Sequence, residues 1–99
     1  MVSGVRPWTL ENFLERFDAW AELQCPTQDL RCIVMNWIMT RDEDPYQGVR
    51  REGGHPNLWV GRIPNSRDGF GHVVVCSYWI KESSRTVSCN LVSTLSLPL

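Results

Sequence analysis

Six basic side chains in the second half of the chain are the residues best suited by type to do chemistry. They are Arg50, Arg51, Arg62, Arg67, Lys81 and Arg85. An arginine guanidinium presents a planar fork of donors that matches phosphate oxygens, and a lysine supplies a point charge. Trp59 and Trp79 fall among these residues and can offer planes on which bases stack. Scattered surface arginines over core tryptophans are the more common arrangement of such residues, and a phosphate-binding surface is the alternative.

Metal and nucleophile chemistry find little support in the sequence. The four cysteines include no C-x-x-C pair and only two histidines are present, so we expect no metal ion and no cofactor. His72 and Cys76 share a predicted strand face but lie about 13 Å apart along it, too far for a Cys–His pair. No export signal or membrane-spanning run is seen, so we expect reduced thiols, a cytoplasmic location and no membrane partner.

Charge is divided unequally along the chain. The first 47 residues carry eight acidic side chains against four arginines, whereas the remainder carries six basic side chains against three acidic ones. The formal net charge is −1. The total therefore gives no nucleic-acid footprint, but the second half can present a modest basic surface.

Two amphipathic helices are predicted in the first half, over residues 9–24 and 27–41. Thr9 is the expected N-cap of the first helix, and Thr27 caps the second. Apolar residues follow a helical spacing in both segments. The second helix is apolar almost all round, because Cys32, Met35 and Met39 lie opposite its core stripe. That rear side is either sandwiched in the interior or left for a partner protein.

Three strands are predicted after the helices, over residues 57–63, 71–81 and 85–95. If Glu82-Ser83 form a two-residue hairpin loop, Cys76 lies opposite Cys89 and Val74 lies opposite Leu91, all on the face that contacts the helices. We therefore expect a single α+β domain over residues 1–99, with two N-terminal helices on one face of a three- or four-stranded antiparallel sheet.

The order of elements and several short motifs resemble the RelE/ParE toxin superfamily over about residues 27–95. The matching segments are Asp44-Pro45-Tyr46-Gln47-Gly48, Leu58-Trp59-Val60-Gly61-Arg62, the run from Val73 to Ile80, and Arg85-Thr86-Val87. The resemblance implies a helical hairpin on an antiparallel sheet, and a first strand that would fall at Val2–Val5. It also implies an endoribonuclease that needs no metal ion, with an antitoxin protein, RNA or the ribosome, and a second copy of the chain as partners.

Residue roles follow from the resemblance and from the basic residues together. Arg62, Arg67 and Lys81 are the catalytic candidates, because they can hold phosphate charge as it develops in the transition state. The nucleic-acid contacts expected around them are Arg50, Arg51, Trp59, Trp79 and Arg85. A noncatalytic protein-binding module is the alternative function, using either Cys32, Met35 and Met39 or the tryptophan-bearing sheet face.

Overall fold

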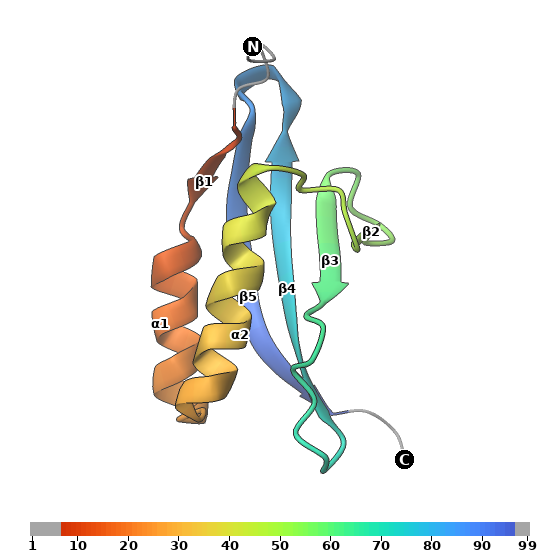
Figure 1. Cartoon of the computed structure of the whole chain (residues 1–99). Coiled ribbons are helices and arrows are strands. Elements are labelled where there is room, and N and C mark those ends of the chain that lie inside the picture. Colours follow the sequence, from red (N-terminus) through yellow and green to blue (C-terminus); the bar gives the residue numbers. More distant parts are fainter. Residues whose placement is uncertain (1–6, 97–99) are drawn as a thin grey trace.

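The protein is a two-layer α+β structure in which two helices cover one face of a twisted sheet (Figure 1). A computed structural model describes residues 7–96. Its helices are α1 (Phe13–Gln24) and α2 (Gln28–Met39), followed by the short 3-10 turn η1 (Thr40–Asp42). Its strands are β1 (Thr9–Glu11), β2 (Arg50–Arg51), β3 (Leu58–Arg62), β4 (His72–Lys81) and β5 (Thr86–Ser96), with the 3-10 turn η2 (Glu82–Ser84) between the last two.

The sheet has five strands in the order β1-β5-β4-β3-β2. Strand β1 runs parallel to β5, with Leu10 beside Val87, and every other pair is antiparallel. The predicted positions of the three main strands are confirmed to within a residue at each end. The predicted three- or four-stranded antiparallel sheet is wrong, since two short edge strands and one parallel pair were missed.

The missed strand β1 replaces the first turn of the predicted first helix. Thr9 is not an N-cap, because its backbone N–H donates to the carbonyl of Arg85 at 2.8 Å and the residue pairs with Thr86. Asn12, with a φ of 64°, then turns the chain into α1 in the left-handed conformation that asparagine tolerates. The strand expected at Val2–Val5 lies outside the described residues.

The core lies between the helices and the sheet. Thr27 caps α2 as predicted, its hydroxyl accepting from the Leu30 N–H at 3.2 Å. Residues at helical spacing in each helix supply the upper layer, and alternate residues of β4 and β5 supply the lower one. The buried set includes Phe13, Phe17, Trp20, Ala21, Val34, Ile38, Val74, Cys76, Tyr78, Ile80, Val87, Cys89 and Val92.

The register of the β4–β5 hairpin differs from the predicted one. The loop has four residues, because Lys81 pairs with Thr86, and Arg85 adopts a left-handed φ of 49° to close it. An extra residue in β5 then bulges out between the pairs Ser77–Leu91 and Tyr78–Cys89. The bulge reverses the side-chain alternation beyond it, so Leu91, expected in the core, is exposed and Val92 is buried. Cys76 and Cys89 are confirmed as buried neighbours, with unbonded sulfurs 4.0 Å apart.

A buried arginine joins the end of α2 to the centre of the sheet. The Arg41 side chain donates to the Gln47 carbonyl at 2.7 Å and to the Tyr78 hydroxyl at 3.2 Å. Its guanidinium carbon also lies 4.1 Å from the centre of a Trp37 ring. The Tyr78 hydroxyl donates onward to the Pro45 carbonyl. These contacts fix the loop of residues 43–49 against β4.

The loop in turn brings β2 to the sheet edge across Gly61. A Cβ at Gly61 would lie 2.7 Å from Val49 Cγ1 and 3.1 Å from the Gly48 carbonyl oxygen. Only a residue without a side chain lets this backbone approach so closely. Arg50 and Arg51 can therefore pair with Val60 and Trp59 of β3.

Both tyrosines are predicted to resist ionisation until strongly alkaline pH. Burial raises the pKa of Tyr78 to about 12, and desolvation with the hydrogen bond to Glu82 raises the pKa of Tyr46 to about 12. The folded state thus keeps protons that the unfolded chain releases near pH 10, so this contribution to stability is complete below pH 10 and is lost as the pH rises towards 12. Phenolate absorbance should show no native tyrosine ionising near pH 10. A native midpoint near 10 that disappears in Tyr78→Phe would contradict the buried hydroxyl.

Substitution of Gly61 by alanine should be costly, because the new Cβ overlaps Val49 and a backbone oxygen. We expect Gly61→Ala to lower the free energy of unfolding by about 1–3 kcal/mol. Gly53→Ala is the matched control, since a Cβ there meets nothing within 4 Å, and its effect should stay within about 0.5 kcal/mol. Urea unfolding measures both. Equal losses in the two variants would show that the close approach at Gly61 is unimportant.

Candidate functional site

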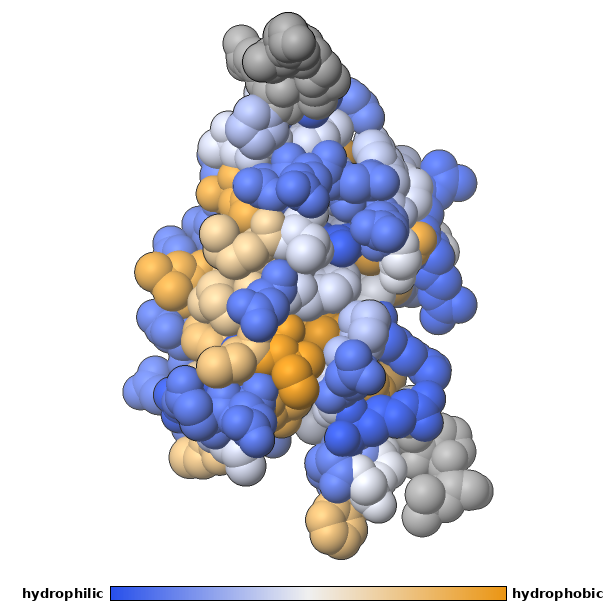
Figure 2. Space-filling model, viewed as in Figure 1, coloured by the Kyte–Doolittle hydropathy of each residue, from blue (hydrophilic) through white to orange (hydrophobic). Residues whose placement is uncertain are grey.

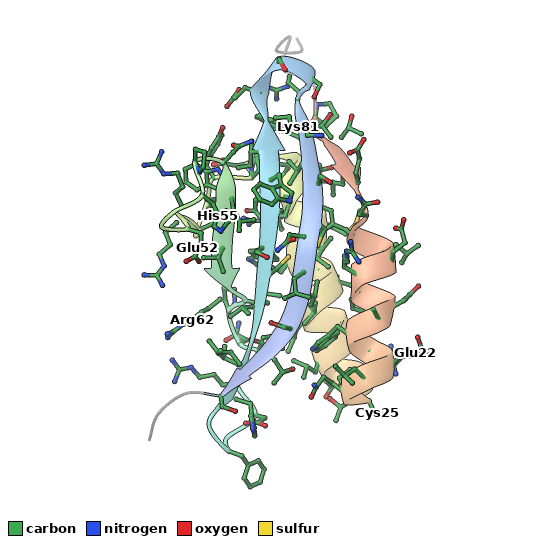
Figure 3. The ribbon with its side chains drawn as sticks, turned by 180° about the vertical axis from the view of Figure 1, so that it is seen from behind. Glu22, Cys25, Glu52, His55, Arg62 and Lys81 are labelled. Atoms are coloured by element: carbon green, nitrogen blue, oxygen red, sulfur yellow. The ribbon has the colours of Figure 1, made fainter. Side chains whose placement is uncertain are left out.

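The candidate site lies on the sheet face that the helices leave bare, called the open face below. A Cβ at Gly61 would lie 3.6 Å from the Trp37 ring, so position 61 faces the helices. Its neighbours Val60 and Arg62 therefore point to the other side, as alternation along a strand requires. Figure 3 views the molecule from that side, with Arg62 extending from the sheet.

Two arginines and one carboxylate line a depression on the open face, of about 660 Å³. Arg50 enters it from β2, Arg62 from the end of β3, and Glu52 from the loop that follows β2. Both arginines are exposed. The floor is largely apolar and spans the sheet from β3 to β5, with Val60, Val75 and Leu95. A shallow, partly apolar floor with two guanidinium groups suits a ligand that carries both phosphates and flat rings.

The other predicted basic residues are dispersed. Lys81 ends β4, whereas Arg62 pairs with Val75, six residues earlier on that strand and therefore roughly 20 Å away. Figure 3 shows Arg62 and Lys81 far apart on the open face, so the expectation that they share one phosphate does not fit the geometry. Arg67 is exposed in the loop between β3 and β4, five residues after Arg62 and near its end of the face.

Arg51 and Arg85 do not join Arg50 and Arg62. Arg51 pairs with Trp59, the position next to Val60, and so belongs to the opposite side of β2 from Arg50. The guanidinium carbon of Arg85 lies 4.4 Å from the centre of a Trp8 ring at the β4–β5 turn. Arg85 therefore contributes a cation–π contact to the fold rather than a charge to the depression.

The two tryptophans expected to stack bases lie on opposite sides of the sheet. Trp59 faces the helices, where its ring packs at right angles to Tyr46, 5.1 Å between centroids. Trp79 is on the open face, half-buried, with the imidazole of His55 beside it at 6.2 Å. The structure thus brings Trp79 to the open face and removes Trp59 from it.

Sequence reasoning missed Glu52 and His55 as site residues. Both lie in the loop of residues 52–57, which folds back so that the Glu52 N–H donates to the Leu58 carbonyl at 2.7 Å. The His55 N–H donates to the Glu52 carbonyl at 3.2 Å. The available signal in the sequence was one acidic residue and one histidine in a loop with two glycines and a proline, next to two arginines. That pattern does not show that the loop folds back towards the sheet.

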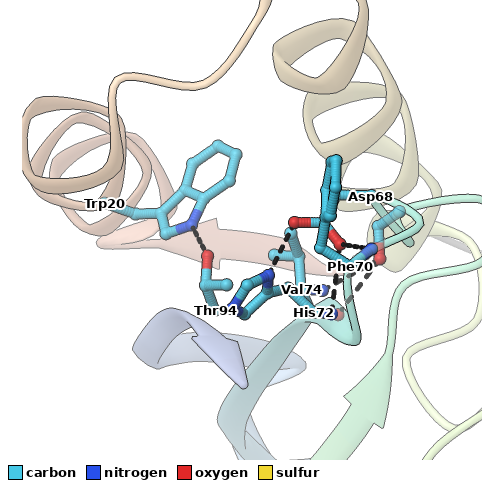
Figure 4. Close-up of polar contacts among 7 residues, drawn as sticks. Trp20, Asp68, Phe70, His72, Val74 and Thr94 are labelled. Carbon is cyan, nitrogen blue, oxygen red and sulfur yellow. Dashed lines mark hydrogen bonds and ion pairs between the residues drawn. The ribbon is translucent and has the colours of Figure 1, made fainter. Parts of the chain in front are cut away.

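A second cavity, of about 310 Å³, lies under the turn between the helices and next to the β3–β4 loop. The Asp68 carboxylate organises that loop by accepting from the Phe70 N–H at 2.7 Å and the His72 N–H at 3.1 Å (Figure 4). It also contacts His72 Nδ1 at 2.6 Å. The Phe70 N–H and then the His72 contact hold the pKa of Asp68 below its ordinary value. These hydrogen bonds explain the contact between Asp68 and His72 as a structural one that stabilises the β3–β4 loop.

The helix side carries apolar surface among hydrophilic side chains (Figure 2). A groove of about 360 Å³ runs between the start of α1 and the end of α2. Met35 and Met39 line it together with Leu14, and Met39 and Leu14 are exposed. Cys32 is exposed one turn earlier on α2. The rear of α2 is therefore open in this chain, rather than sandwiched.

Within residues 7–96, no group of three or more His, Cys, Asp or Glu side chains is arranged to hold a metal ion. Over the same residues, no helix has the length and apolar character needed to cross a membrane.

The likeness of this chain to a known protein lies in its structure. No protein-family model matches the sequence, and no curated protein matches it. The chain is similar in structure to a double arginine-to-alanine mutant of the E. coli toxin RelE in the free state. The TM-score is 0.59, and the match covers 87% of this chain and 81% of that chain at 12% sequence identity. The fold is RelE-like. At this identity the likeness establishes the fold alone, and it confirms the resemblance first drawn from the sequence motifs.

Proposed function

We propose that this RelE-like protein is a toxin-type endoribonuclease that binds and cleaves RNA on its open face. The observation that carries the proposal is the convergence of Arg50 and Arg62 on one depression opposite the helices. Arginine is suited to this role because its donor fork holds two oxygens of one phosphate. The acidic helices lie behind the sheet, so the overall charge of −1 does not describe the face that meets RNA.

The chemistry proposed for the depression needs only groups that are present there. The 2′-hydroxyl of a bound ribonucleotide attacks the adjacent phosphorus, and Glu52 accepts the hydroxyl proton. The bond from phosphorus to the 5′-oxygen then breaks, which leaves a 2′,3′-cyclic phosphate on one fragment and a 5′-hydroxyl, protonated by water, on the other. Negative charge rises on the phosphate oxygens, where Arg62 and Arg50 stabilise it more strongly than in the ground state. Arg62 and Arg50 thus replace the set Arg62, Arg67 and Lys81. Arg67 and Lys81 are proposed to contact phosphates farther along the RNA.

Partners and location follow from the same proposal. An RNA-cleaving toxin requires a neutralising antitoxin, and its substrate is messenger RNA, free or on the ribosome, in the cytoplasm. These assignments depend on the proposed RNA cleavage and are tested by the same experiment.

We expect expression of the wild-type protein in bacteria to arrest growth and fragment transcripts. Arg62→Ala should slow cleavage by about ten- to a hundredfold, because it removes a charge-assisted contact made in the transition state. Arg50→Ala should act in the same direction, and Glu52→Gln should slow cleavage without weakening RNA binding. Arg16→Ala, an exposed arginine of α1, is the matched control and should remain toxic. Normal growth with intact transcripts, from well-expressed folded wild type, would refute the nuclease.

The helix-side groove supports a second candidate function, the binding of a partner protein. Exposed apolar side chains that line a groove are typical of protein interaction sites. Leu14, Met35 and Met39 provide such a lining here.

A groove substitution should separate this function from RNA cleavage. If the product of an adjacent gene binds the protein, we expect Met39→Glu to weaken that binding by about tenfold or more, because it places a charge in an apolar contact. Leu23→Glu changes an even more exposed apolar residue of α1 outside the groove and should bind normally. Isothermal titration compares the two. Equal affinities would exclude the groove as the binding surface.

A further inference from the structure

An aromatic pair stands on the open face next to the depression, outside the proposed chemistry. The rings of His55 and Trp79 meet at 77°, with centroids 6.2 Å apart. His55 is exposed, whereas Trp79 is half-buried. Directly across from Trp79 in the register is Leu58, which is nearly covered although it belongs to the same face. Trp79 and Leu58 are therefore neighbours on this face, and Trp79 keeps part of its surface exposed.

Two backbone hydrogen bonds fix the position of His55. The loop of residues 52–57 is closed at its base by the bond from Glu52 to Leu58 and internally by the bond from His55 to Glu52. The loop therefore holds His55 beside Trp79, with the histidine still exposed. A large aromatic ring left partly exposed forgoes part of the roughly 200 Å² that a tryptophan buries in a core. Trp79, beside the fixed His55, therefore provides a surface on which another ring can stack.

The aromatic pair and the two arginines form an ordered series along the sheet. Residues paired across neighbouring strands form rows on this face. The first row is Leu58 with Trp79, and the last row is Arg62 with Val75. Between them lies the row that joins Arg50, Val60 and Ser77. Successive rows are two residues apart, which is about 7 Å along a strand. An extended ligand lying along β3 would therefore meet an aromatic surface, one guanidinium and then a second.

We propose that Trp79 and His55 form a base-stacking subsite for single-stranded RNA, about 13 Å along the strands from Arg62. This inference rests on the proposed function and names its substrate class. When a nucleotide stacks on Trp79, the RNA backbone continues towards Arg50 and then Arg62, in the same order as the rows. Bases inside a duplex have no free faces, so the subsite selects unpaired RNA.

The test compares RNA with and without bases at constant charge. The probes are 2′-O-methyl oligomers of about ten nucleotides, one oligoadenylate and one abasic, which lack the nucleophilic hydroxyl and cannot be cleaved. Fluorescence anisotropy at fixed salt gives both affinities. Wild type should prefer the oligoadenylate by about five- to 150-fold. Trp79→Leu should lose most of that preference, and Trp79→Phe, which keeps an aromatic plane, should retain much of it.

Variants at the two ends of the site distinguish the inference from the proposed function. Arg62→Ala should weaken binding of both oligomers alike and leave their ratio unchanged, because it removes a phosphate contact. His55→Ala should reduce the ratio, whereas His72→Ala, the matched control on the helix side of β4, should not. A preference for bases that persists in both Trp79→Leu and His55→Ala would overturn the subsite. So would a wild type that binds both oligomers equally. Failure to bind either oligomer would overturn the proposed function as well.

Discussion

The burial of one charged side chain, Arg41, is the constraint on which the rest of the structure depends. A guanidinium removed from water costs several kcal/mol unless hydrogen bonds or a counter-charge compensate it. Among the described residues no carboxylate forms an ion pair with Arg41, and its partners are the Gln47 carbonyl, the Tyr78 and Thr40 hydroxyls and the Trp37 ring. All of these are oriented dipoles or a π face. The Arg41 side chain can make all of these contacts only when α2, the following loop and β4 are all in place.

This requirement connects the helix side of the molecule to the open face. The loop that accepts from Arg41 continues into Val49, which packs over the bare backbone of Gly61, and then into Arg50. One guanidinium buried on the helix side thus determines where another guanidinium stands on the opposite side. Arg41 and Arg50 are nine residues apart in sequence but have opposite roles. Arg41 is removed from water and organises the fold, whereas Arg50 remains exposed and can bind a ligand.

Local patterns predicted the parts of the fold that depend on local interactions. The apolar spacing of both helices, the cap at Thr27 and the three main strands were recognised because each is expressed within about a dozen residues. The strand at Thr9–Glu11 was mistaken for a helix start because its identity depends on β5, more than seventy residues away. The bulge in β5 moved Leu91 out of the core and Val92 into it, and no local signal at those positions announces an extra residue. For the site, Arg50, Arg62 and Trp79 lie on the open face, and their roles there stay a prediction. The separation of Lys81 from Arg62 and the reversal of Trp59 required strand register, which the sequence left open.

The parallel pairing of β1 with β5 also affects how the chain reaches this structure. The first described strand and α1 both rest on β5, as the bond from Trp20 to Thr94 illustrates. Such long sequence separations make folding slow, because loop closure must precede the contacts that reward it. During synthesis the apolar face of α1 cannot be fully covered until β5 has been made, because α1 packs mainly on that strand. The nascent chain therefore exposes apolar side chains of α1, such as Phe17 and Trp20, until β5 emerges, and apolar surface of this kind promotes aggregation and binds chaperones.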